Sequence, residues 1–219
     1  MKSILFTFSL FAFSLSYSQS FPISFDSAVT TSDFIDFDGG TAIVRVNPSK
    51  TGINLSDSVA RMVRDSGQIW AGSKLVLSAN LDFSVNTKIT MKVYTTASIG
   101  TVLKFKLESS AGSVEVDALT TVSGSWETLE WIFAGTPNIF NEVVFMFDFG
   151  NLGNGMASST FFFDDIQQVV GPPAPSLLSL PVNFESGIVS SDFLDFSGAV
   201  GSVILNPHMT GINTSSKVG

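Results

Sequence analysis

Cysteine is absent from the 219 residues, which excludes disulfide bonds, thiolate metal sites and a cysteine nucleophile. Histidine is nearly absent, and the single one, His208, lies close to the end of the sequence. A Ser-His-Asp triad or a histidine metal site therefore cannot form in the segment before it. Basic residues are also few, 11 against 19 acidic ones, and the net charge of −8 argues against nucleic-acid binding, which needs a basic surface.

The first 18 residues have the composition of a secretory signal peptide. Lys2 supplies a positive charge, Ile4–Leu15 is apolar, and Ser16–Ser18 before Gln19 fits a small-x-small cleavage site. An uncleaved anchor is the alternative, although the apolar run is shorter than the about 20 residues that span a bilayer. Every later apolar run contains charges, so no membrane insertion is expected after cleavage. We expect an exported protein, secreted or at the cell surface, and the lack of cysteine favours a bacterial one.

A repeat is the strongest internal signal. Phe21-Pro-Ile-Ser-Phe-Asp-Ser is matched by Leu180-Pro-Val-Asn-Phe-Glu-Ser, 159 positions later. At the same offset, Asn47-Pro-Ser-Lys-Thr-Gly-Ile-Asn is matched by Asn206-Pro-His-Met-Thr-Gly-Ile-Asn, without any gap between the two matches. Two copies of one module are therefore predicted.

The repeat and a proline-rich segment divide the chain. We expect a first module over residues 19–170, a linker over 171–179, and the start of a second, incomplete copy over 180–219. Because that copy would lack strands to cover its apolar side chains, residues 177–219 are predicted to be poorly ordered or to lean on the first module. The simplest interpretation is that the sequence is a fragment of a longer polypeptide.

The first module has a hydrophobic period of two, which is typical of β-strands. In Lys88–Tyr94, the side chains of Ile89, Met91 and Val93 are predicted to point inward. Further strands are predicted over Leu103–Glu108, Ser113–Ala118, Glu127–Phe133, Val143–Phe149 and Phe161–Ile166, separated by turns rich in Gly, Asn, Ser and Asp. No segment has a sustained helical period. An all-β fold made of a two-sheet β-sandwich is therefore predicted.

One acidic pair deserves comparison with known catalytic strands. Glu115-Val-Asp117 resembles the Glu-x-Asp-x-x-Glu strand of certain retaining β-glucanases, but position 120, where the third acid would stand, is threonine. Solvated acids on a strand are the better interpretation. We therefore predict no catalytic residue and no enzyme activity in this segment.

Three motifs together resemble a known class of module. Phe21-Pro-Ile-Ser-Phe-Asp-Ser, Ser125-Trp-Glu-Thr-Leu and Phe161-Phe-Phe-Asp-Asp-Ile are similar to those of the carbohydrate-binding jelly-roll modules of secreted bacterial glycan-degrading proteins. More narrowly, the chain resembles tandem modules of marine Bacteroidota proteins. The resemblance implies a non-catalytic jelly roll that binds a polysaccharide such as the β-glucan laminarin. Two alternatives remain: an adhesive or structural spacer of a surface protein, and the accessory region of a glycoside hydrolase whose catalytic domain lies beyond residue 219.

The resemblance also implies a structural calcium ion between the first and last strands of the module. The matching residues here are Asp26 and either Asp164 or Asp165. Carboxylate and carbonyl oxygens are the ligands that Ca²⁺ prefers. The family more often has glutamate at the first position, where this chain has the shorter aspartate. The alternative is that these acids are solvated and hold no ion.

A sugar-binding surface needs aromatic rings that stack on pyranose C–H faces and polar groups that bind hydroxyls. Trp70 lies among small residues, where a tryptophan of the core is less expected. It could instead plug one end of the sandwich. The candidate ligand residues, in order, are Trp70, Tyr94 and Trp126, with Arg64 and Gln68 as polar partners of Trp70.

Overall fold

The computed structural model describes residues 19–27, 29–174, 182–185, 188–195 and 198–219. They form two compact units, which divide between Pro172 and Pro173. The predicted signal peptide, the second half of the linker and the first residues of the second copy lie outside the described residues. Among the residues that are described, no helix is long and apolar enough to cross a membrane.

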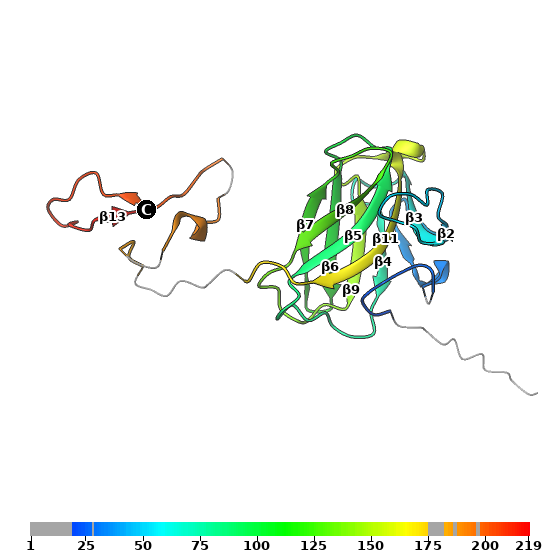
Figure 1. The fold of residues 1–219 in the computed structure, drawn as a ribbon, viewed down its shortest axis with the longest axis horizontal. Coiled ribbons are helices and arrows are strands. Elements are labelled where there is room, and N and C mark those ends of the chain that lie inside the picture. The colour runs from blue at the N-terminus through cyan, green and yellow to red at the C-terminus, as the bar shows by residue number, and fades with distance from the viewer. Residues whose placement is uncertain (1–18, 28, 175–181, 186–187, 196–197) are drawn as a thin grey trace, which may run out of the picture. The chain divides into compact units, whose positions relative to one another are not determined.

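The first unit is a sandwich of two antiparallel sheets (Figure 1). One sheet has the strand order β1 (Ile35–Phe37), β4 (Gly72–Val76), β9 (Glu142–Phe147), β6 (Val102–Ser109) and β7 (Gly112–Leu119). The other has the order β10 (Gly153–Asn154), β3 (Ser58–Ser66), β11 (Thr160–Val169), β5 (Lys88–Thr95) and β8 (Trp126–Ile132), with β2 (Gly40–Val46) paired to β3. Two 3₁₀ turns, η1 (Thr31–Asp33) and η2 (Ala157–Ser159), complete the unit. The predicted all-β sandwich of jelly-roll type is confirmed.

The six predicted strands correspond to β5, β6, β7, β8, β9 and β11. Their alternation places one set of side chains between the sheets, as predicted for Ile89, Met91 and Val93, which are fully buried. Phe163 lies at the centre of this core. Its ring centroid is 5.0 Å from that of Phe145. The large phenylalanine content of the sequence therefore fills the space between the two sheets.

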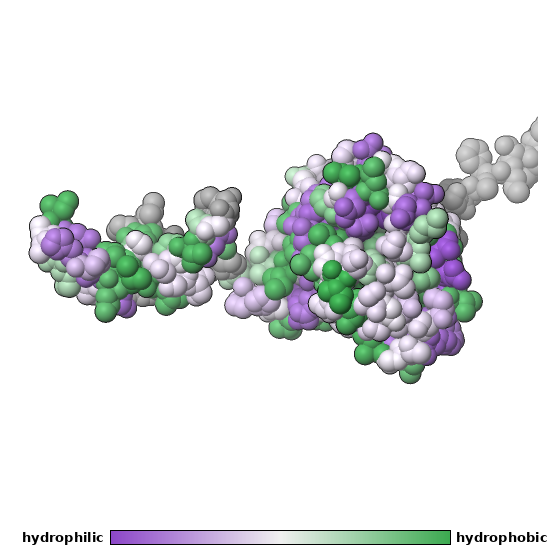
Figure 2. Space-filling model, turned by 90° about the horizontal axis from the view of Figure 1, so that it is seen from above, coloured by the Kyte–Doolittle hydropathy of each residue, from purple (hydrophilic) through white to green (hydrophobic). Residues whose placement is uncertain are grey.

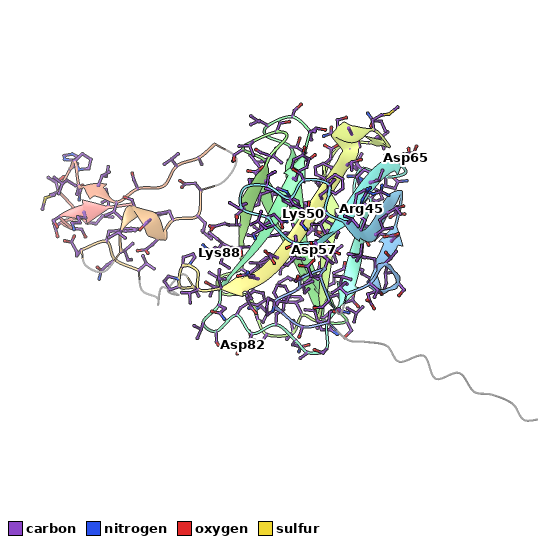
Figure 3. The ribbon with its side chains drawn as sticks, turned by 45° about the vertical axis from the view of Figure 1, so that its right-hand side comes forward. Arg45, Lys50, Asp57, Asp65, Asp82 and Lys88 are labelled. Atoms are coloured by element: carbon purple, nitrogen blue, oxygen red, sulfur yellow. The ribbon has the colours of Figure 1, made fainter. Side chains whose placement is uncertain are left out.

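A strap, Asn47–Asp57, connects β2 to β3 and covers part of the outer face of the six-stranded sheet. The Asn47 side-chain amide donates to the Ser56 carbonyl at 3.0 Å, which closes the strap on itself. The carbonyl of Ser49 accepts a hydrogen bond of 2.7 Å from the indole of Trp126 on β8, so the strap reaches across the sheet. Lys50 forms an ion pair with Asp57 within it (Figure 3).

The second unit contains η3 (Ser190–Asp192), β12 (Ile204–Leu205) and β13 (Lys217–Val218). At the repeat offset it forms the same local hydrogen bonds as the first unit. The Asn206 amide donates to the Ser215 carbonyl at 2.8 Å, as Asn47 does to Ser56. Several apolar side chains that this unit contains, including Leu194, Leu205 and Ile212, are largely exposed. The strap geometry is therefore encoded locally by its Asn and Ser residues, without support from a packed sandwich.

Candidate functional site

The outer face of the five-stranded sheet is hollowed into a groove with a volume of about 560 Å³. Its floor is apolar, because Val144 and Met146 on β9 point outward and are 2% and 5% exposed. Ile35 and Phe37 line it on the side of β1, and Phe149 follows β9. On the surface seen in Figure 2, apolar and hydrophilic side chains are interspersed in small patches, so a large apolar patch does not dominate that face.

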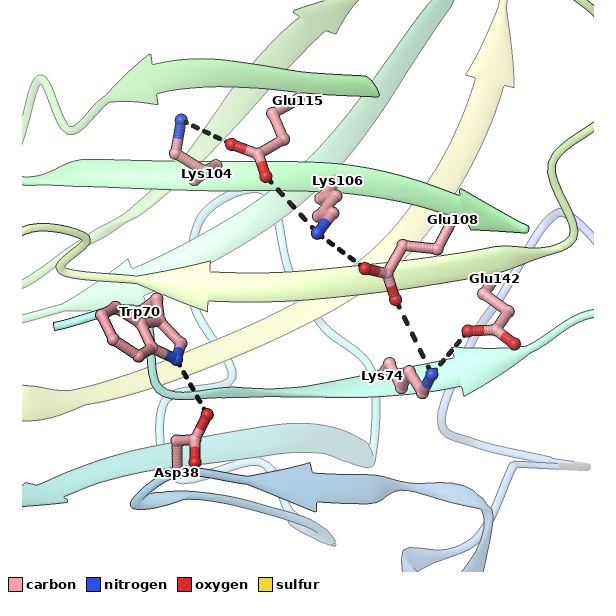
Figure 4. Close-up of polar contacts among 8 residues, drawn as sticks. All are labelled: Asp38, Trp70, Lys74, Lys104, Lys106, Glu108, Glu115 and Glu142. Atoms are coloured by element: carbon pink, nitrogen blue, oxygen red, sulfur yellow. Dashed lines mark hydrogen bonds and ion pairs between the residues drawn. The ribbon is translucent and has the colours of Figure 1, made fainter. Parts of the chain in front are cut away.

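Trp70 lies at one end of the groove, on the loop between β3 and β4 (Figure 4). Its indole Nε1 donates to the Asp38 carboxylate at 2.8 Å, and the residue is 45% exposed. The backbone N–H of Gln68, on the same loop, donates to the Asp38 carbonyl at 2.8 Å. Gly67 makes this approach possible, because a Cβ on it would lie 1.7 Å from that carbonyl oxygen. The indole is therefore fixed in orientation while much of it stays open to solvent.

A ladder of alternating charges crosses the groove over four strands (Figure 4). Its members are Glu142, Lys74, Glu108, Lys106, Glu115, Lys104 and Asp117. The closest contacts are 2.6 Å between Lys74 and Glu142 and 2.6 Å between Lys106 and Glu108. The strand register places Lys104 opposite Asp117 and Lys106 opposite Glu115, and opposite charges on neighbouring strands attract. Glu108 and Glu142 face each other across β6 and β9, and the Lys74 ammonium group lies within 3.7 Å of both carboxylates. Every lysine in the ladder therefore has a carboxylate partner.

The ladder alters the pKa of two of its lysines. The hydrogen bond from Lys74 to Glu142 raises the pKa of Lys74, against a smaller opposing effect of burial. Burial lowers the pKa of Lys106, but its hydrogen bond to Glu108 and the charges of Glu108 and Glu115 more than offset this, and the pKa rises. Both lysines are therefore charged at neutral pH.

Of the predicted residues Trp70, Gln68 and Arg64, only Trp70 lines the groove. Arg64 is fully buried, and its guanidinium donates to the carbonyls of Phe147, Asp148, Gln68 and Asn151. Arg64 was predicted to be a polar ligand partner, but its terminal nitrogens donate to backbone carbonyls, its Nε is buried without a partner, and no part of it reaches solvent. It joins the loop of Trp70 to the loop after β9 instead. Burial lowers the pKa of Arg64.

Tyr94 and Trp126 lie on the outer face of the other sheet, on β5 and β8. Their ring centroids are 5.7 Å apart, and Trp126 is 8% exposed beneath the strap. They cannot act together with Trp70 on one ligand, because the whole sandwich separates them. The sequence ranked all three as candidate ligand residues but did not predict that they lie on different faces of the sandwich.

The predicted metal ligands differ in their burial and in their partners. Asp165 adopts a left-handed conformation at a bulge in β11 and forms an ion pair of 2.5 Å with Lys92. Asp26 is exposed, and its carboxylate accepts a hydrogen bond of 2.6 Å from the Ser58 amide at the start of β3. Across the described part of the chain, no three His, Cys, Asp or Glu side chains converge as a metal site would require.

Asp164 is the exception among these acids. It lies on β11 beneath the strap, is fully buried, and neither of its carboxylate oxygens accepts a well-formed hydrogen bond. Burial raises the pKa of Asp164, and the nearby Ser56 and Asn54 side chains only partly oppose this. The Asn54 side-chain nitrogen is buried without a partner as well. An unpaired buried carboxylate is costly, so it points to a proton or a cation at this position.

Comparisons with known proteins found no family model and no curated protein sequence that matches the chain. Several solved structures are similar to part of it. The family 11 carbohydrate-binding module of the cellulosomal cellulase Lic26A-Cel5E of Clostridium thermocellum is 15% identical, with a TM-score of 0.44, over 63% of this chain and 86% of that one.

Two further structures have a comparable degree of similarity. TmCBM61, solved with β-1,4-galactotriose, is 15% identical over 69% of this chain and 97% of its own, with a TM-score of 0.44. The K1 cleaved adhesin domain of Lys-gingipain from Porphyromonas gingivalis W83 is 13% identical over 66% and 94%, with a TM-score of 0.43. At these identities and TM-scores the similarity carries no argument about function, which has to be argued from the groove.

Proposed function

We propose that the first unit is a non-catalytic carbohydrate-binding module and that the groove is its binding site. The observation that carries this proposal is the half-exposed indole of Trp70, which Asp38 fixes at the end of an apolar floor made by Val144 and Met146. Sugar rings present apolar C–H faces to such aromatic and aliphatic surfaces. The surrounding carboxylates and ammonium groups can bind hydroxyls. Small-ligand sites commonly combine an apolar surface with a few such polar groups.

The same groove does not support glycoside hydrolysis. A glycosidase needs one carboxyl group that protonates the glycosidic oxygen and a second that acts as nucleophile or base. In this groove the carboxylates are paired with lysines instead. Glu108 and Glu115 are each within 3.7 Å of two lysine ammonium groups. We therefore assign to this unit the role of holding an exported protein, secreted or at the cell surface, on a polysaccharide such as a β-glucan. Any catalysis would belong to another domain.

Replacing Trp70 by alanine should lower glycan affinity by at least about tenfold, since loss of a stacked indole removes more than about 1.4 kcal/mol. The measurement is affinity electrophoresis and calorimetry against laminarin, mixed-linkage β-glucan, xylan and galactan. Trp126→Phe, on the opposite sheet, is the matched control and should leave the affinity unchanged. If no glycan binds, or if Trp70→Ala binds as well as the wild type, the proposal fails.

We also infer that residues 180–219 belong to a second module of the same kind. The matching hydrogen bonds of Asn47 and Asn206 support this inference, as does the uninterrupted sequence match at one offset. Two weak modules on one chain would bind a polymer with a higher apparent affinity than either alone, because the second contact becomes intramolecular.

A structural Ca²⁺ is the third part of the proposal. Asp164 fits such an ion, because its carboxylate is buried and lacks partners beneath the strap. Asp165 does not fit, since it is paired with Lys92. Bound calcium would supply the countercharge that Asp164 lacks. The ion would then attach the strap to β11 without any disulfide.

A further inference from the structure

We propose that the groove binds an internal stretch of an uncharged polysaccharide and that Glu108 and Glu115 exclude anionic chains from it. The inference rests on the carbohydrate-binding function proposed above and names the substrate class of that same groove. Two independent features carry it: the charge arrangement of the ladder and the continuation of the groove across the sheet.

The ladder leaves no ammonium group for an anionic sugar. Its three lysines face four carboxylates, and each lysine lies within 2.8 Å of one of them. Lys104 is in addition 4.4 Å from the centre of the Phe149 ring. A sulfate or uronate would have to displace a carboxylate from its lysine and then remain beside it. Like charges placed side by side in this way are strongly unfavourable, so the arrangement discriminates against anionic polymers.

Glu108 and Glu115 have the central positions in this arrangement. Glu108 joins Lys74 to Lys106, at 3.7 and 2.6 Å. Glu115 joins Lys106 to Lys104, at 3.5 and 3.4 Å. Both line the groove itself. Removing the two negative charges would leave three lysines against two carboxylates and would turn a net negative ladder into a net positive one.

The groove also continues beyond the part that contains Trp70. A second hollow, of about 490 Å³, shares Lys74 and Glu108 with it and extends to Ser109–Ser113 at the turn between β6 and β7. Together the two hollows are lined by residues of all five strands, and five strands span about 19 Å at their usual spacing. A surface of this length accommodates several consecutive sugar rings, as an internal stretch of a chain requires.

The experiment compares each neutral polymer with its own charged derivative. Laminarin, mixed-linkage β-glucan, xylan and galactan are each tested beside their carboxymethyl forms, with the whole chain as the binding protein. The neutral polymer that binds best should bind at least roughly tenfold more tightly than its carboxymethyl form. Its affinity should change little between low and high NaCl, because no net ion pair forms on binding. Oligosaccharides of the same sugar should gain affinity with length.

The variant Glu108→Gln/Glu115→Gln should reverse this preference and make binding of the carboxymethyl polymer sensitive to salt. Glu130→Gln is the matched control, since it removes one carboxylate that pairs with Lys88 at 2.9 Å on the other sheet. It should leave the preference as in the wild type. If the double variant does not fold, as judged by its melting curve, the single variant Glu115→Gln is used instead. It leaves three lysines against three carboxylates and should therefore reduce the preference for the neutral polymer without reversing it.

The outcomes separate the two proposals. Binding that depends on Trp70 but does not favour the neutral polymer would overturn the present inference and leave the carbohydrate-binding function standing. Equal shifts in the double variant and in Glu130→Gln would overturn it as well. Absence of binding to every polymer would instead overturn the carbohydrate-binding function itself.

Discussion

Replacing Arg64 by methionine should lower the free energy of unfolding by about 3 kcal/mol, or the melting temperature by roughly 6–12 °C. The guanidinium is fully buried and donates to four backbone carbonyls, those of Phe147, Asp148, Gln68 and Asn151. Methionine has a similar length but no donors, so these carbonyls would lose their partner. Chemical denaturation followed by tryptophan fluorescence measures the change.

Two further arginine variants make this result interpretable. Arg64→Lys should recover only part of the loss, because one ammonium group cannot reach carbonyls in two loops. Arg45→Met is the matched control: Arg45 is exposed, and its guanidinium lies 5.8 Å from the centre of the Phe162 ring. It should cost no more than about 1 kcal/mol. Equal effects of Arg64→Met and Arg45→Met would contradict the role given to Arg64.

Arg64→Met should also weaken glycan binding at temperatures where the variant is still folded. The guanidinium holds Gln68, two residues before Trp70, and the loop after β9 that carries Phe149 towards the groove. Without the guanidinium, the Trp70 indole would be held less firmly in the orientation that binds the sugar. The readout is the dissociation constant for the best glycan, measured well below the melting temperature of the variant.

Asp164→Asn should have opposite effects on stability in calcium and in EDTA. In calcium at about 100 times its dissociation constant, the wild type should gain about 2.7 kcal/mol, and the variant should lose most of this gain. In EDTA the variant should be as stable as the wild type or more so, because it removes a buried unpaired carboxylate. Melting curves of both proteins in both conditions measure the difference.

The pH dependence in EDTA adds a separate check. Because burial raises the pKa of Asp164, the folded protein binds more protons than the unfolded chain between the two pKa values. Stability in EDTA should therefore fall as the pH rises through this window, and Asp164→Asn should lack this contribution. Asp26→Asn makes the same change at Asp26, the exposed residue among the predicted metal ligands. Melting curves of wild type and Asp164→Asn that do not differ between calcium and EDTA would rule out the ion.

The sequence predicted the later strands well and the earlier ones not at all. In β5 the apolar and polar positions alternate strictly, so one set had to face the core. In β3 they do not, because the inward set Ala60 and Met62 also includes Arg64, while Val59 is buried beneath the strap. The hydrophobic period of two that identifies a strand is therefore lost in β3. Its arginine points inward, and one of its apolar residues is covered from outside.

The candidate site was predictable only in part for a similar reason. Trp70 could be selected because it lies among small residues. The ladder could not, because Lys74 pairs with Glu142 from a strand 68 residues later. Such a pairing depends on sheet register, and no local pattern encodes it. For the same reason the sequence could not tell that Tyr94 and Trp126 lie on the sheet that faces away from the groove.

The ladder has a thermodynamic consequence for binding. Long charged side chains normally lose rotamer entropy when a ligand immobilises them, at about 0.5–1.5 kcal/mol for each. Here Lys74, Lys106 and Glu108 are already held by one another before a sugar arrives. The ladder is thus preorganised. Much of the entropic cost of ordering its side chains is incurred on folding and not on binding. Glycan binding should then show a smaller entropic penalty than binding to a surface of free lysines and glutamates.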